Sequence, residues 1–328
     1  MKRLVIFLLT ATFLLGLCAC GGAAEPGLRE VTLVLDYVPN TNHTGIYAAQ
    51  ALGYFEAQGL KVTIVEPGDN DPTTLCAVGK AEFAVTYQEN VTYARAAAEP
   101  LPIRAVATIL PHNTSGFVTR AEDGITGPAD FEGKVYAGWQ APSEAAVLEA
   151  VMTAAGADFS ELTMVGAVGS GLTAMTNGID IQWEFEGWSV TYDRMQGLDV
   201  AYLPIRDLDP RLDYYTPVII TNETMIAEHP DTICRFLTAV EQGYAYAIEQ
   251  PLAAAELMHT VIPEYDLEFI TESQLFLSAQ YTQEGTPWGM MQDAVWDGYT
   301  EFMVEQGLID RLVPASEQFT NAFLPKGS

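Results

Sequence analysis

The chain has 328 residues, of which 49% are hydrophobic, and a formal net charge of −28 at pH 7. This length is sufficient for one large domain or two lobes of ordinary size. A surface this acidic repels nucleic acid and anionic lipid headgroups, so we expect no nucleic acid partner.

The first 19 residues have the features of an export signal. Lys2 and Arg3 precede an apolar run, VIFLLTATFLLGL, that is too short for a comfortable membrane span. The run ends in LCAC, which resembles a bacterial lipobox, and Cys20 fits best as the lipidated residue because a small alanine precedes it. An ordinary secretory signal cut nearby is the alternative. Either way we expect an exported protein; with the lipid, residues 20–30 would tether it to the outer face of the cytoplasmic membrane.

Strand-like and helix-like segments alternate after the tether. We expect strands over residues 31–36, 61–67, 82–87 and 103–110, with helices over 44–58, 72–80 and 89–99. This alternation favours an α/β fold in which helices cover a mainly parallel sheet.

A second set of alternating segments follows. Strands are expected within 130–140, 162–168, 179–187, 200–205 and 213–222, and helices over 142–156, 170–178, 230–250, 251–262 and 293–307. Two lobes joined by extended crossings near 112–120 and 214–222 suit this layout. The boundaries would be 31–115 for the first part of lobe 1, 116–216 for lobe 2, and 217–328 for the return to lobe 1.

Four loops follow strands where ligands bind in α/β sheets, namely residues 36–43, 86–90, 138–144 and 183–188. Aromatic rings there could stack on a flat heteroaromatic ligand, and carboxylates and amides could pair with its nitrogens. The candidate ligand-binding residues from the last three loops are Gln88, Glu89, Trp139, Ser143, Trp183 and Trp188. The alternative is that the aromatics pack inside a lobe and the polar groups cap helices, which is the favoured role for Ser143.

Residues for catalysis or metal binding are scarce. The sequence has no P-loop, HExxH or dinucleotide-binding glycine motif, and we expect no cofactor and no metal. His43 is the one credible catalytic base, and it also lies in the first candidate loop. Cys76 and Cys234 show no metal-ligand spacing, and they could be buried thiols or a disulfide.

Several segments together resemble the NMT1/THI5-like branch of solute-binding proteins, the ligand receptors of bacterial ABC importers. They are LDYVPNTNHTGIYAAQALGYFEAQGLKV, VGKAEFAVTYQENVTYARA, FEGKVYAGW, NGIDIQWEFEGW and HPDTICRFLTAVEQGYAYAIEQP, and the resemblance covers essentially the whole chain after residue 30.

The resemblance implies a two-lobed, hinge-closing fold of the type II periplasmic-binding-protein kind, with the ligand cleft between the lobes. It implies a thiamine-precursor pyrimidine as ligand, such as a formylamino- or hydroxymethyl-aminopyrimidine, and a permease as partner of a monomer. Asp36, Tyr37 and Asn40 would lie in the cleft, and Tyr37 stands where relatives often have tryptophan. Glu186 matches an acidic position that suits an aminopyrimidine edge.

The same superfamily contains pyrimidine synthases that use pyridoxal phosphate. Their lysine and histidine align with Thr86 and Asn90 here, and a Schiff base cannot form without the lysine amine. We therefore expect a binding protein and not an enzyme. Riboflavin or another flat heterocycle, an exported enzyme using His43, and a ligand sensor remain alternatives. An alkyl sulfonate is disfavoured because the four loops contain no lysine or arginine.

Overall fold

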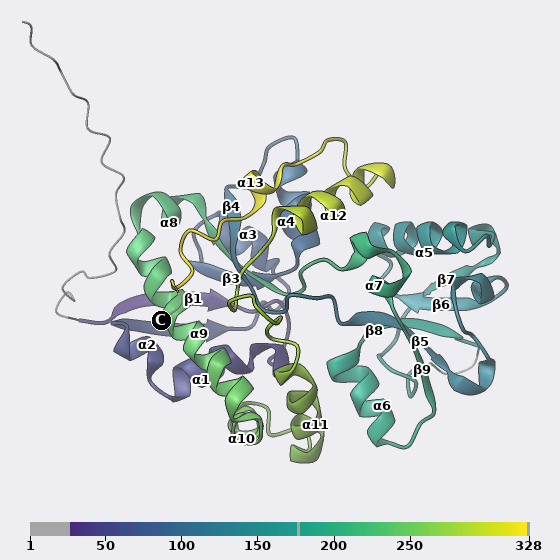
Figure 1. Cartoon of the computed structure of the whole chain (residues 1–328), viewed down its shortest axis with the longest axis horizontal. Helices are drawn as coiled ribbons and strands as arrows, with labels where there is room; N and C mark the ends of the chain where they lie inside the picture. Colours follow the sequence, from purple (N-terminus) through teal and green to yellow (C-terminus); the bar gives the residue numbers. More distant parts are fainter. Residues whose placement is uncertain (1–26, 176–177, 327–328) are drawn as a thin grey trace, which may run out of the picture.

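The computed structural model describes residues 27–175 and 178–326, which form two lobes joined by two chain crossings (Figure 1). The predicted export signal and the predicted lipidation site, Cys20, lie outside the described residues. Within the described part of the chain, no helix is both long and apolar enough to cross a membrane. The α/β, two-lobed fold expected from the sequence is confirmed.

The first lobe is built on a five-stranded sheet of order β2-β1-β3-β10-β4. Its strands are β1 (Arg29–Val34), β2 (Leu60–Val65), β3 (Phe83–Thr86), β4 (Ile103–Thr108) and β10 (Val218–Asn222). Strand β1 is parallel to β2 and β3, whereas β10 is antiparallel to β3 and β4. The β-branched run of β10 is buried on both faces, with Ile219 in one core and Val218 and Ile220 in the other.

Helices cover both faces of this sheet. They are α1 (Thr44–Ala51), α2 (Tyr54–Ala57), α3 (Pro72–Ala77), α4 (Gln88–Ala96), α8 (Glu223–Glu228), α9 (Pro230–Glu249), α10 (Pro251–Val261), α11 (Leu267–Ser278), α12 (Asp293–Glu305) and α13 (Ala315–Gln318). The helix expected over 44–58 is split, because Gly53 adopts a positive φ of 74°. Helix α11 was not predicted from the sequence.

The second lobe has a five-stranded sheet of order β7-β6-β8-β5-β9. The strands are β5 (Ser115–Arg120), β6 (Val135–Gly138), β7 (Thr163–Gly166), β8 (Ile181–Phe185) and β9 (Val200–Pro204), and the helices are α5 (Pro142–Ala154), α6 (Thr191–Met195) and α7 (Ile205–Leu208). The helix predicted over 170–178 is wrong for the described residues 170–175, which form a turn. Two hydrogen bonds stabilise the turn: the backbone N–H of Gly171 donates to the carboxylate of Glu184, and that of Leu172 donates to the carboxylate of Asp193.

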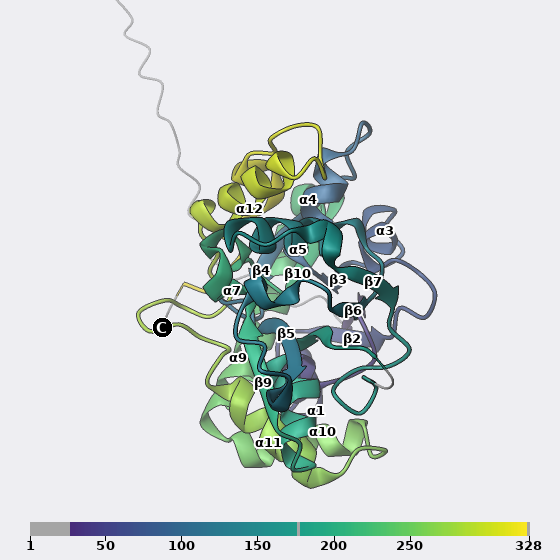
Figure 2. The same ribbon diagram turned by 90° about the vertical axis from the view of Figure 1, so that its right-hand side faces the viewer.

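The chain passes between the sheets at residues 109–114, the first crossing, and at 213–217, the second crossing. Both are shorter than the extended crossings expected from the sequence, because β5 and β10 already belong to the sheets. The two crossings contact each other, since His112 Nδ1 lies 2.7 Å from Asp213 Oδ2. Viewed from the side, α12 and α5 lie near one end of the molecule and α10 and α11 near the other (Figure 2).

Helix α12 follows the return to the first lobe and packs against both lobes, with Trp296 in the core cluster that contains Val218 and Ile220 of β10. Tyr299, Phe302 and Met303 join the core cluster that contains Phe117 and Tyr136. The assignment of residues 217–328 to lobe 1 follows the path of the chain. The lobe boundaries given above therefore stay a prediction.

Candidate functional site

A cavity of about 380 Å³ lies between the lobes. The first lobe contributes Tyr37, Tyr87, Glu89 and Asn90; the second contributes Trp139, Ala141, Ser143, Glu144, Trp183 and Phe185; and Ser115, Tyr214 and Thr216 come from the crossings or their ends. Most of these residues follow strands β3 and β6 or lie within β8, so the cavity lies where the carboxyl ends of the strands face each other.

One side of the cavity is aromatic. The rings of Trp139 and Trp183 are 6.0 Å apart and tilted by 49°. Trp183 is buried within β8, whereas Trp139 is 59% exposed at the rim. Gln140, next to Trp139, has a positive φ of 62°, a conformation that non-glycine residues adopt rarely and that is often found at functional sites.

Glu89 connects the two lobes at this cavity. Its Oε1 accepts a hydrogen bond from Ser143 Oγ of the second lobe at 2.9 Å, and its Oε2 accepts one from Tyr299 of α12 at 2.7 Å. Burial raises the pKa of the Glu89 carboxyl, although these two hydrogen bonds oppose the shift. Ser143, for which the sequence favoured a capping role, instead contacts the carboxylate of the other lobe.

Glu144 has a structural role beside Glu89. Its carboxylate accepts hydrogen bonds from the Tyr136 hydroxyl at 2.5 Å, from the Trp139 backbone N–H at 2.9 Å and from the Ala141 backbone N–H at 2.8 Å. The bond to Ala141 satisfies a free N–H group before the first turn of α5. Glu144 therefore fixes the loop that carries Trp139.

Asp36 and His43 form a buried pair beside the cavity. The His43 Nε2 atom lies 2.7 Å from Asp36 Oδ1, and the Asn40 backbone N–H donates to His43 Nδ1 at 3.2 Å. Burial acts to raise the pKa of Asp36, but the charge and hydrogen bond of His43 and a hydrogen bond from Tyr87 lower it overall. His43 has no solvent exposure, and both of its ring nitrogens have partners.

The structure brings Tyr37, Glu89, Trp139, Ser143 and Trp183 together, out of the residues expected at the ligand site. The other expected residues are absent from this lining, which is drawn from the described part of the chain. They are Asp36, Asn40, His43, Gln88, Glu186 and Trp188.

Asp36 and His43 pair with each other, and each of the other four absent residues contacts another part of the protein. Gln88 anchors the second crossing, because its Oε1 accepts from the Tyr215 backbone N–H at 2.9 Å. The Asn40 side chain caps a short helical turn, and Glu186 pairs with Arg194 at 3.0 Å. Trp188 packs edge-on against Phe269 of α11, with ring centroids 4.7 Å apart.

The sequence did not identify Ser115, Tyr214 and Thr216 as cavity residues. They lie in or beside the crossings, and the stretch containing Tyr214 and Thr216 was interpreted as a strand. Two adjacent tyrosines shortly before Pro217 were the sequence feature that could have indicated a binding residue here. Only the path of the crossing shows that Tyr214 faces the cavity.

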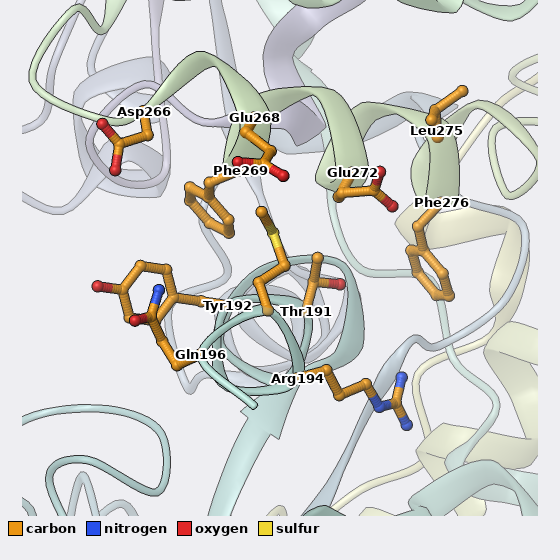
Figure 3. A pocket seen from close by; sticks show the side chains of 11 residues that line it. Thr191, Tyr192, Arg194, Gln196, Asp266, Glu268, Phe269, Glu272, Leu275 and Phe276 are labelled. Carbon is orange, nitrogen blue, oxygen red and sulfur yellow. The ribbon is translucent and has the colours of Figure 1, made fainter. Parts of the chain in front are cut away.

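A second hollow of about 620 Å³ separates α6 from α11 (Figure 3). Phe269 and Phe276 extend from α11 toward α6, and Glu268 and Glu272 lie along the same helix. Arg194 on the opposite side is already paired with Glu186. Its lining, within the described part of the chain, contains no tryptophan and shares no residue with that of the smaller cavity.

The described residues contain no group of three or more His, Cys, Asp or Glu side chains that could hold a metal ion. No disulfide joins Cys76 to Cys234. Cys76 is buried between α3 and the first sheet, and burial raises the pKa of its thiol.

Solved structures with the same architecture include solute-binding proteins and the desulfurization enzyme DSZB. The periplasmic aliphatic sulphonate binding protein SsuA from Escherichia coli superposes with a TM-score of 0.69 at 14% identity, covering 92% of this chain and 94% of that chain. The alkanesulfonate-binding protein SsuA from Xanthomonas axonopodis pv. citri gives a TM-score of 0.68 at 12% identity, covering 91% and 99%. The fold is that of the type II periplasmic binding proteins.

Three proteins with similar sequences are named for a heterocyclic ligand or product. A formylaminopyrimidine-binding protein from Halalkalibacterium halodurans is 27% identical over 97% of this chain and 98% of its own length. The riboflavin-binding protein RibY from Chloroflexus aurantiacus is 28% identical over 93% and 89%. A 4-amino-5-hydroxymethyl-2-methylpyrimidine phosphate synthase from Legionella pneumophila is 23% identical over 90% and 92%. Residues 40–254 match the family described as NMT1/THI5 like, and the chain belongs to that family.

Proposed function

We propose that the chain is an exported solute-binding protein that takes a small, flat nitrogen heterocycle into the cavity between its lobes. The ligand we favour is a thiamine-precursor pyrimidine of the formylamino- or hydroxymethyl-aminopyrimidine kind. The observation that carries this proposal is the cavity itself, which combines the Trp139–Trp183 pair with the Glu89 carboxyl. Ring stacking would contribute about 0.5–1.5 kcal/mol beyond area burial.

The cavity volume supports a small ligand. About 380 Å³ lies near the lower end of the roughly 300–1,000 Å³ that is usual for ligand pockets. A single ring with short substituents suits this space better than the three fused rings and sugar-alcohol chain of riboflavin. Riboflavin remains the second candidate because a relative of similar identity is named as its binding protein.

The chemistry of the lining argues against a sulfonate. Among the described residues, those that line the cavity include two carboxyl groups and no lysine or arginine. A sulfonate would face these carboxyl groups without a compensating cation, and an unpaired buried charge is costly. The likeness to the two sulfonate-binding proteins is therefore one of fold.

We also propose that the chain is not an enzyme, although some relatives are named as synthases. Thr86 and Asn90, which align with the synthase lysine and histidine, hydrogen-bond to each other at 3.1 Å. His43 is buried against Asp36 and lies outside the cavity lining described above. The Thr86–Asn90 pair therefore offers no amine for a Schiff base, and His43 offers no free base to a ligand in the cavity.

Delivery of the ligand to an ABC permease, attachment through a lipid on Cys20 and a monomeric state complete the proposal. Metabolic labelling with a fatty acid would test the anchor: wild-type protein should be labelled and the Cys20→Ser variant should not.

Calorimetric titration tests the ligand. The panel is 4-amino-5-hydroxymethyl-2-methylpyrimidine, its formylamino counterpart, riboflavin, thiamine and an alkanesulfonate. We expect saturable one-site binding of a pyrimidine and none of the sulfonate. Binding of the sulfonate alone, or of none of the heterocycles, would sink the ligand assignment.

A further inference from the structure

Glu89 presents a carboxyl group whose hydrogen-bonding capacity is only half used. Each oxygen accepts one hydrogen bond from the protein, Oε1 from Ser143 and Oε2 from Tyr299. A carboxylate offers about four acceptor positions. Glu89 lines the cavity, so one position on each oxygen remains for a ligand.

Within residues 27–175 and 178–326, the titratable groups that act on Glu89 are phenols and a carboxyl group, and none supplies a positive charge. Tyr93 lies on its own helix α4, Tyr299 on α12 and Tyr214 on the second crossing, and burial raises the pKa of all three, to about 12 for Tyr93. These phenols are therefore neutral near pH 7. Glu144 at the start of α5 is the other carboxyl group of the cavity, and its oxygens already accept three hydrogen bonds.

A carboxyl group without a counter-charge holds a proton readily, and burial raises the pKa of Glu89 in this direction. In its acid form such a group has one O–H donor and one carbonyl acceptor side by side. An amino group next to a ring nitrogen presents the complementary pair, an N–H donor and a nitrogen acceptor.

We propose that Glu89 selects the ligand by pairing with an amino group and the ring nitrogen beside it, and that the complex holds one proton between that carboxyl and that nitrogen. The inference rests on the proposed function and specifies its ligand class as heterocycles with an amidine edge. When the free carboxyl is ionised and the free ligand neutral, the shared proton comes from the solvent. It sits on the carboxyl oxygen or on the ring nitrogen, and both forms keep two hydrogen bonds.

The same pairing links ligand recognition to contact between the lobes. Ser143 belongs to α5 of the second lobe and donates to Oε1, one of the two carboxyl oxygens that would pair with the ligand. A ligand held by Glu89 is therefore held at the point where the lobes touch.

Calorimetry in buffers of different ionisation enthalpy counts the protons exchanged on binding. With wild-type protein and 4-amino-5-hydroxymethyl-2-methylpyrimidine at pH 7.5, we expect uptake of a large fraction of one proton. The analogue that lacks only the amino group should bind about 10- to 100-fold more weakly, because the carboxyl then loses a partner.

Two substitutions distinguish the acidity of the Glu89 side chain from its hydrogen-bonding geometry. Glu89→Gln keeps one acceptor and one donor on the same side chain, so we expect binding within a few-fold of wild type and no proton uptake. Glu89→Ala removes both groups and should weaken binding about 10- to 100-fold. Glu256→Gln, an exposed position on α10, is the matched control and should change neither quantity.

The proton count on wild-type protein needs no variant, so poor folding of Glu89→Ala would not obstruct the test. If the pyrimidine binds without proton uptake and its des-amino analogue binds equally well, the role of Glu89 is overturned while the proposed function stands. If no heterocycle binds at all, both fail.

Discussion

Two tryptophans of the cavity differ in what holds them. Trp183 is 6% exposed and packs edge-on against Phe117 in the core of the second lobe, with ring centroids 5.6 Å apart. Trp139 is 59% exposed, and its loop is fixed by the bond from its backbone N–H to Glu144. The Trp183 ring thus belongs to both the lobe core and the cavity, whereas the exposed Trp139 ring is available to stack on the ligand.

This difference predicts that two alanine substitutions both weaken binding but differ in their effect on stability. Trp139→Ala should raise the Kd for the pyrimidine about 3- to 10-fold, from lost stacking, and leave the free energy of unfolding nearly unchanged. Trp183→Ala should lower that free energy by about 3–5 kcal/mol as well. Titration and urea unfolding of both variants provide the check; a large loss of stability in Trp139→Ala would contradict the description of the rim.

The buried Asp36–His43 pair gives a second prediction at this scale. Removing the imidazole leaves the buried carboxylate with the hydrogen bond from Tyr87 but without its ion-pair partner, so His43→Ala should lower the free energy of unfolding by about 3–5 kcal/mol at pH 7. His43→Gln, whose amide can still donate to Asp36, should recover part of the loss.

The pH dependence of this loss follows from the lowered pKa of Asp36. Its contribution is present above the unfolded-state pKa of about 3.9 and is lost as pH falls through the lower folded-state value. The gap between wild type and His43→Ala should therefore narrow below about pH 4 in urea unfolding. An equal gap at pH 3.5 and pH 7 would show that the charge of Asp36 does not matter.

At the scale of elements, helices α1 and α9 approach each other closely through two glycines. A Cβ atom at Gly243 would overlap the carbonyl oxygen of Gly45, and one at Gly45 would overlap the ring of Tyr244. This contact fixes α1, which begins directly after His43. The sequence predicts both helices but gives no sign of how closely they pack.

Alanine at these positions should behave unlike alanine elsewhere. Gly243→Ala must push the helices apart and should cost about 1–3 kcal/mol or more of unfolding free energy. Gly298→Ala in α12 is the control, because the nearest atom to its Cβ would be Arg211 Cγ at 4.0 Å. There we expect no loss, and up to about 1 kcal/mol of gain from better helix propensity. Equal effects of the two substitutions would refute the close contact.

The turn over residues 170–175 rests on two buried acids. Burial raises the pKa of Glu184 to about 6 and also raises that of Asp193, while backbone N–H groups of the turn oppose both shifts. A carboxyl whose folded-state pKa is raised binds its proton more tightly when folded. Stability should therefore fall as pH rises from about 4.3 to about 6, by about 2 kcal/mol for Glu184.

Glu184→Gln keeps an acceptor for the Gly171 N–H but cannot ionise. We expect the variant to be more stable than wild type at pH 7.5 and to lose that advantage at pH 4.5. Thermal unfolding of both proteins across this range measures the difference. A constant difference at all pH values would mean that Glu184 does not titrate in the folded protein.

At the scale of the whole molecule, the sequence predicted the α/β lobes well because buried strands and amphipathic helices leave local patterns. The β-branched run of β10 is one such pattern. All four predicted loops supply cavity residues, because the carboxyl ends of strands meet there.

Long-range geometry accounts for what the sequence missed. Tyr214 lines the cavity through the path of the second crossing, and Trp188 turns away because the chain enters a π-helix (Glu186–Val190) directly after β8. Ser143 occupies a capping position by sequence, but its partner is Glu89, 54 residues away in the chain. Such contacts depend on how the lobes meet, which no local pattern records.

A structure of the protein with bound 4-amino-5-hydroxymethyl-2-methylpyrimidine tests the central claim most directly. We predict the pyrimidine ring against Trp139 and Trp183 in the 380 Å³ cavity, with its amino group and adjacent ring nitrogen on the carboxyl of Glu89. A ligand seated in the groove between α6 and α11, or one whose amino edge faces solvent, would contradict the account.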